Sequence, residues 1–189
     1  MQTITKVYDR YERARQVVRE LERAGIPSSS ISLLANKTIS EQHVDVAEAS
    51  EAGTGAGIGA VVGGTAGLLT GLGLLAIPGL GPVVAAGWLA TTALGAIAGG
   101  IVGALIDAGV PEDQAHIYSE AVRRGGTLIS VKADDSKAMI VHAILERHQP
   151  IDPIREGAEY RKTGWSEFDP DAPPFVPEGI EVERIRRVN

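Results

Sequence analysis

Few residues in this chain of 189 could do chemistry at the spacings that such sites require. A metal centre needs several His, Cys or carboxylate ligands close together. The chain has no Cys, and its four His are His43, His116, His142 and His148. His142 and His148 share one expected helix but lie six residues apart, so they point to different faces. We therefore expect no metal site, no cofactor site and no catalytic residue, and hence a protein that is not an enzyme.

Three other motifs have a structural explanation that is simpler than a chemical one. Residues 53–59 read GTGAGIG and resemble a dinucleotide-binding loop, but no expected strand directly precedes them. Asp134 and Asp135 fit the start of a helix better than a catalytic pair. Arg123 and Arg124 could hold an anion, but the sequence favours a solvated last helical turn, where the helix dipole stabilises basic side chains.

Charge is distributed unevenly along the chain, whose formal net charge is −6. All 18 Lys and Arg and all 24 Asp and Glu lie outside residues 52–106, which we call the uncharged segment. We expect no nucleic-acid partner, because nucleic-acid binders carry an excess of Lys and Arg. Lys6, Asp9 and Arg10 interrupt the N-terminus before any stretch that resembles an export signal, so we expect a cytoplasmic location.

The charged flanks predict a small α+β domain. Residues 3–8 (TITKVY) alternate as a half-buried strand does, and Ala14, Val17 and Leu21 recur at helical spacing. The same criteria predict strands over 3–8, 31–35, 127–133 and 151–155, and helices over 9–24, 111–124 and 134–148.

An internal repeat favours a ferredoxin-like arrangement of these elements. At an offset of 124 residues, Val7 matches Val131 and the LER of 21–23 matches the LER of 145–147. Two strand–helix–strand units on one sheet form a ferredoxin-like α+β sandwich. Chance similarity between two amphipathic helices is the alternative. If the repeat holds, the uncharged segment interrupts the sandwich between its halves.

The uncharged segment predicts a long Gly/Ala-rich α-helical hairpin of the glycine-zipper type. Small residues recur at a four-residue spacing in two rows, which are Gly55, Gly59, Gly63, Gly67 and Gly71, and then Gly87, Thr91, Gly95, Gly99 and Gly103. Between the rows, Pro78, Gly79, Gly81 and Pro82 predict the hairpin turn. The arms, 54–76 and 83–106, would each be about 35 Å long, enough to cross the hydrocarbon core of a bilayer.

Such arms need burial on every side. Each Gly costs a helix about 1 kcal/mol relative to Ala, and close helix packing can offset that cost. Helices that are apolar all round lie in lipid or inside protein. Length and lack of charge favour lipid, whereas the acidic neighbours Glu48, Glu51 and Asp107 do not fit the Lys/Arg-rich flanks of membrane spans. Membrane insertion and a pooled core in a soluble homo-oligomer both stay open.

The expected organisation has four parts. A ferredoxin-like domain comprises 1–37 and 110–156, a linker covers 38–50, the helical hairpin covers 51–109, and an extended Pro-rich tail covers 157–189. Trp165 and Phe168 predict that the tail is anchored on its own domain or on a neighbouring subunit, because disordered segments are poor in aromatic residues. A mobile tail with incidental aromatics is the alternative.

Seven runs of the sequence together carry a family resemblance, and they are AGIPSSSISLLA, GTGAGIGAVVGG, GLGLLAIPGLGPVVAAG, GVPEDQA, VRRGGTLISV, LERH and GWSEFDPDAPP. They resemble the YflT-like general stress protein family, whose members are also described as low-temperature-induced or heat-induced stress proteins. The resemblance spans nearly the whole chain. It implies a bacterial stress-response protein without an established catalytic activity, and it provides no active-site motif to carry over.

Together these observations lead to two functional hypotheses. The first is a non-enzymatic bacterial general stress protein that self-assembles through glycine-zipper helical hairpins. Its partners would be other copies of itself or membrane lipid, in a soluble cytoplasmic assembly or at the inner membrane with both flanks cytoplasmic. The second is a regulatory small-ligand-binding module, in which ferredoxin-like domains form a pocket within a soluble oligomer.

Overall fold

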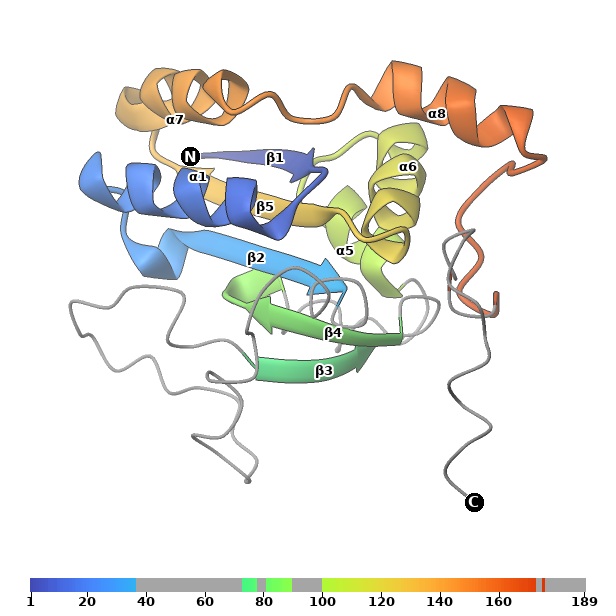
Figure 1. Ribbon diagram of the computed structural model, residues 1–189. Coiled ribbons are helices and arrows are strands. Elements are labelled where there is room, and N and C mark those ends of the chain that lie inside the picture. The colour runs from blue at the N-terminus through green and yellow to red at the C-terminus, as the bar shows by residue number, and fades with distance from the viewer. Residues whose placement is uncertain (37–72, 78–80, 90–99, 173–174, 176–189) are drawn as a thin grey trace.

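The computed structural model describes residues 1–36, 73–77, 81–89, 100–172 and 175. They form a mixed α+β fold around an antiparallel five-stranded sheet of order β1-β5-β2-β4-β3 (Figure 1). The strands are β1 (Gln2–Tyr8), β2 (Ile31–Asn36), β3 (Gly73–Ile77), β4 (Gly81–Ala86) and β5 (Thr127–Ala133). The described helices are α1 (Tyr11–Arg23), α5 (Gly100–Asp107), α6 (Glu112–Arg123), α7 (Asp135–Arg147) and α8 (Pro153–Lys162), with a 3-10 turn η1 (Ser28–Ser30).

β5 is the centre of the part of the sheet that the charged flanks build. Val131 of β5 lies opposite Ile4 of β1 on one side and opposite Ile31 of β2 on the other. β1 and β2 therefore run parallel to each other, with the antiparallel β5 between them. The expected strands over 3–8, 31–35 and 127–133 are confirmed to within one residue at each end.

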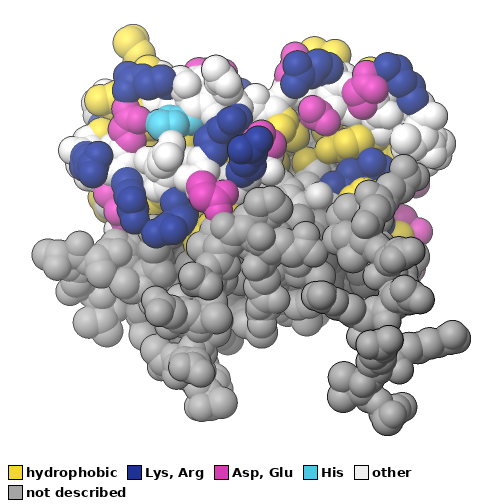
Figure 2. Space-filling view, in the orientation of Figure 1, with side chains coloured by type: hydrophobic (Ala, Val, Ile, Leu, Met, Phe, Trp, Pro, Cys, Tyr) yellow, Lys and Arg dark blue, Asp and Glu magenta, His cyan; other side chains and the backbone are white. Residues whose placement is uncertain are grey.

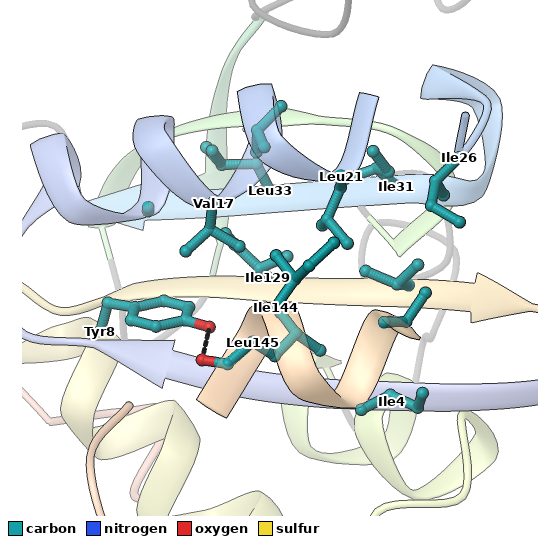
Figure 3. Close-up of a cluster of buried hydrophobic side chains, with 14 of the residues drawn as sticks. Ile4, Tyr8, Val17, Leu21, Ile26, Ile31, Leu33, Ile129, Ile144 and Leu145 are labelled. Atoms are coloured by element: carbon teal, nitrogen blue, oxygen red, sulfur yellow. Dashed lines mark hydrogen bonds between the residues drawn. The ribbon is translucent and has the colours of Figure 1, made fainter. Parts of the chain in front are cut away.

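Helices α1 and α7 cover one face of this sheet (Figure 3). Val17 and Leu21 of α1 and Ile144 of α7 pack on alternate residues of the strands, because alternate strand side chains share a face. Tyr8 reaches into the same layer, where its hydroxyl donates a hydrogen bond of 2.9 Å to the Leu145 carbonyl. Burial raises the pKa of Tyr8 above its ordinary value, so the phenol stays protonated and keeps donating.

Helices α5, α6 and α8 contribute to a second apolar layer, which includes Val7 and Leu128 from the opposite face of the sheet. This layer also takes in buried residues of the uncharged segment, which are Ala85, Leu89, Ile101, Ala104 and Leu105. Part of the uncharged segment is therefore built into the core of the domain. Among the described residues, no helix combines the length and the apolar character that a membrane span needs.

The helical hairpin expected over 51–109 is wrong for the residues on either side of its expected turn. Residues 73–77 and 81–86 are strands, and Ile77 lies opposite Gly81, so the chain reverses within the expected turn. β4 pairs with β2, whose backbone N–H and C=O groups would otherwise form an open edge. Residues 100–106 of the second arm are helical, in α5, whereas 54–72 and 90–99 lie outside the described residues.

The strand expected over 151–155 is also wrong, because α8 begins at Pro153. The Asp152 carboxylate accepts hydrogen bonds from the N–H groups of Ile154 and Arg155, at 2.9 and 3.4 Å, and so caps the helix. Proline is favoured in a first helical turn, where its missing N–H costs nothing. Ile151 keeps one link to the sheet, since its N–H donates to the Val7 carbonyl at 2.8 Å.

Candidate functional site

The most connected charged group among the described residues is Glu120 of α6. Its side chain is only 1% exposed, and both carboxylate oxygens accept hydrogen bonds from Arg123, at 2.7 Å each. Arg124 donates to the same carboxylate at 2.6 Å. Spacings of three and four residues place these side chains together on one helix face. The hydrogen bond to Glu120 raises the pKa of Arg123 above its ordinary value.

Two aromatic rings flank the second guanidinium of this cluster. The Arg124 guanidinium carbon lies 4.3 Å from the centre of the Tyr160 ring in α8 and 5.1 Å from the centre of the Phe175 ring in the tail. Arg123 lies 5.7 Å from the same Phe175 ring. The interpretation of Arg123 and Arg124 as a solvated last turn is therefore wrong. Both are partly buried and share one carboxylate, so the cluster holds helices and tail together rather than presenting two free cations.

The extended tail expected from residue 157 is wrong at its start, because residues 157–162 are helical in α8. Beyond that helix, the tail packs on α6 and α8 through the two aromatic residues singled out from the sequence. Phe168 is 5% exposed and lies in the second apolar layer, and Trp165 packs against that layer. The Trp165 and Tyr160 rings meet edge to face, with centres 5.6 Å apart. The Phe168 N–H donates a hydrogen bond of 3.2 Å to Nδ1 of His116. These contacts place the tail, as far as Phe168, on its own domain.

A cavity of about 150 Å³ opens beside His116, between the start of α6 and the tail. It is lined by Glu112, Asp113, His116, Arg161, Trp165, Ser166 and Glu167. Because Nδ1 of His116 accepts the Phe168 N–H, the neutral ring carries its proton on Nε2. Small-molecule sites usually enclose about 300 Å³ or more, so this cavity is small for a metabolite.

The remaining candidates for chemistry have structural surroundings. His142 is exposed, and Nε2 of His148 lies 2.7 Å from a carboxylate oxygen of Glu20, which also pairs with Arg147. His43 and the GTGAGIG loop lie outside the described residues. Asp134 occupies the N-cap position of α7, and Asp135 pairs with the amino terminus at 3.2 Å. Within the described parts of the chain, no group of three His or carboxylate residues could hold a metal ion.

The residues expected at the helix-packing interface and at the hairpin turn have different outcomes. Gly55, Gly59, Gly63, Gly67, Gly71, Gly95 and Gly99 lie outside the described residues, as do Pro78 and Gly79 of the turn. Gly81 and Pro82 begin β4, opposite Ile77 and Ala76. Gly103 is in α5, and apart from its chain neighbours and the backbone of its own helix, no described atom lies within 4 Å of the point where a Cβ would stand.

Gly87 has a different role from the helix-packing one expected of it. It directly follows β4 with φ of +86°, a conformation that L side chains rarely adopt. A Cβ there would stand 2.3 Å from the Ile31 carbonyl oxygen. Gly87 thus lets the chain cross against β2, and the next turn is fixed by the Leu89 N–H, which donates to the Ser32 hydroxyl at 3.1 Å.

The sequence analysis did not predict two interactions in this region, which are the Glu120 cluster and the contact between Gly157 and Ile117. The ExxRR pattern of 120–124 could have indicated the carboxylate–guanidinium cluster, because it has the spacing of helical ion pairs. Gly157 gives no comparable signal. It allows α8 to approach α6 so closely that a Cβ would stand 2.7 Å from Cδ1 of Ile117.

The chain matches no protein-family model, no curated protein and no solved structure. The resemblance to YflT-like general stress proteins therefore stays a prediction from the sequence.

Proposed function

We propose that this chain is a non-enzymatic bacterial general stress protein whose copies associate through the uncharged segment. The main support is the position of that segment in the sheet. It supplies β4 and β3, so the sheet passes from charged flanking strands at β1 to strands without any charged residue at β3.

The charge distribution makes this end of the sheet the preferred contact between copies. Each chain carries a net charge of −6, and all of its charged residues lie outside 52–106. Figure 2 shows side chains of both signs over the described flanks. Like-charged molecules repel one another, and contact through an uncharged surface minimises both that repulsion and the desolvation of ions.

We further propose that the flanks form a ferredoxin-like unit, and their architecture supports this. β1, α1 and β2 form a strand–helix–strand unit with β5 between its two strands, and α7 shares the face of α1. Ile151 contacts the outer side of β1, where the second strand–helix unit would place its last strand. In a ferredoxin-like arrangement, α8 would stand in place of most of the last strand of the second unit.

The test compares two substitutions that add the same charge. Ala66→Glu places a carboxylate in the uncharged segment, and Ala158→Glu places one at an exposed position of α8. Masses of the full chain are measured by light scattering in detergent-free buffer. We expect Ala66→Glu to lower the assembly mass and Ala158→Glu to leave it unchanged. Equal masses for both variants and the parent would overturn the proposal, as would a parent chain that pellets with carbonate-washed membranes and is monomeric in detergent.

A further inference from the structure

β3 is the last strand of the sheet and has a neighbour on one side. Its residues 73–77 pair with 81–85 of β4, and no described strand pairs with its other side. In an edge strand, alternate backbone N–H and C=O groups point outward without a partner strand. Such an edge can accept a further strand.

The two edges of the sheet differ in how they are protected. β1, at the opposite edge, carries Lys6, and its Val7 carbonyl is already occupied by the Ile151 N–H. β3 reads GLLAI and has neither a charged residue nor a proline. Natural proteins discourage edge-to-edge pairing with charged residues or prolines in the edge strand, and the β3 sequence contains neither.

We propose that β3 pairs antiparallel with β3 of a second copy of this chain, around a two-fold axis at Leu75. The inference rests on the proposed self-association and names its contact. In this register Gly73 lies opposite Ile77 of the other copy, and Leu75 lies opposite Leu75. A two-fold contact uses the same patch on both copies, so one uncharged strand is sufficient. The two sheets become one, and their charged flanks lie at its far ends.

A second copy fits this edge better than an unrelated strand does. The edge offers no charge to attract a basic or acidic partner, so backbone pairing and apolar contact are its available interactions. A copy of the same strand supplies both, and it is present whenever the protein is present. Pairing also hides the edge from further strands, because a two-fold contact closes on itself.

The absence of Cys allows a direct test by disulfide scanning. In antiparallel pairs, directly opposed Cα atoms lie about 4.5–5.5 Å apart, within the range that a disulfide bridges. Leu75→Cys should therefore form a cross-linked dimer under mild oxidation. Leu74→Cys, the matched control, lies opposite residue 76 and is too far from its own counterpart. We expect the Leu75→Cys variant to form a cross-linked dimer at least ten times faster than the Leu74→Cys variant.

Mixing two different Cys variants provides a second test, which still holds if the Leu75→Cys variant does not fold. Leu74→Cys and Ala76→Cys chains, mixed before oxidation, should form a heterodimer that neither forms alone. Cross-linking that is equal at 74 and 75, or absent at 75 and in the mixture, would overturn the proposed pairing. If the reduced chains still assemble in that case, the proposed self-association stands without the β3 contact. If the reduced chains are monomeric, both the proposed self-association and the proposed β3 contact are wrong.

Discussion

Gly157 of α8 lies against Ile117 of α6, and a Cβ on Gly157 would stand 2.7 Å from Cδ1 and 3.2 Å from Cγ1 of that side chain. Ile117 is 4% exposed, so it has little room to move aside. The close approach of two helices through a glycine, expected for the uncharged segment, thus occurs between α6 and α8.

Gly157→Ala should destabilise the domain. Overpacking costs about 1–3 kcal/mol, and it opposes a gain in helix propensity of about 1 kcal/mol. We expect a net loss of about 1 kcal/mol in the free energy of unfolding, measured by urea denaturation. Adding Ile117→Val removes Cδ1 and should restore part of that loss. A double variant less stable than Gly157→Ala would contradict the packing explanation.

Glu120→Gln should be more costly than a change at a surface ion pair. It leaves Arg123 and Arg124 without their shared carboxylate, and breaking a buried pair costs about 3–5 kcal/mol. Because the two Arg side chains are 14% and 23% exposed, we expect about 2–3 kcal/mol.

Glu159→Gln is the matched control for this cluster. Glu159 pairs with Lys162 at the surface, where such pairs contribute about 0–1 kcal/mol. Similar losses in the two variants, measured by urea denaturation, would show that the Glu120 cluster has no special role.

The tail should be held mainly by Phe168. Truncating a buried Phe to Ala costs about 3–5 kcal/mol, and Phe168 is 5% exposed. Phe168→Ala should release the tail to proteolysis, and Trp165→Ala should do so less completely because Trp165 is only partly buried. Ser166→Ala, at an exposed position between them, is the control. Unchanged protease resistance and assembly size in both aromatic variants would refute tail docking.

Gly87 should tolerate alanine much less well than Gly109. Both have positive φ, +86° and +90°, and so share the strain of about 1–2 kcal/mol that alanine suffers there. Only Gly87 adds a clash with the β2 backbone, since among the described residues no atom beyond the chain neighbours of Gly109 lies within 4 Å of a Cβ placed there. Gly87→Ala should therefore speed hydrogen exchange of β2 amides, and Gly109→Ala should not. Equal exchange in both would argue against the close crossing.

Acid should weaken the link between α1 and the end of α7. The hydrogen bond to His148, and then the charge of Arg147, hold the pKa of Glu20 below its ordinary value of 4.5. A lowered folded-state pKa stabilises the fold above the unfolded pKa, and that contribution disappears as pH falls through the folded one. The stability difference between the parent and Glu20→Gln should thus shrink below pH 4.5, as followed by thermal unfolding. A difference that grows with acidity would contradict this pairing.

Local patterns were sufficient for the flanks and insufficient for the uncharged segment. Val17 and Leu21 revealed the buried stripe of α1 because helical spacing depends only on neighbouring residues. The local pattern of residues 73–86 did not reveal that they form strands, because a short apolar run fits a buried strand as well as a helix. The open edge of β2, which decides the choice, is distant in sequence.

The remaining errors have separate physical causes. Asp152 and Pro153 carried a helix-start signal that the strand interpretation of 151–155 overlooked. Gly157 could not have been recognised from sequence alone, because its importance depends on Ile117 of another helix. Glu120 could have been recognised, since its two Arg partners follow at helical spacing.

The mass of the unmodified full chain in solution tests the central claim most directly. Sedimentation velocity in detergent-free buffer, over a series of protein concentrations, reports that mass without any substitution. The proposal predicts a discrete species at a multiple of the 19.8 kDa chain, populated more as concentration rises. A single 19.8 kDa species at every concentration would contradict it.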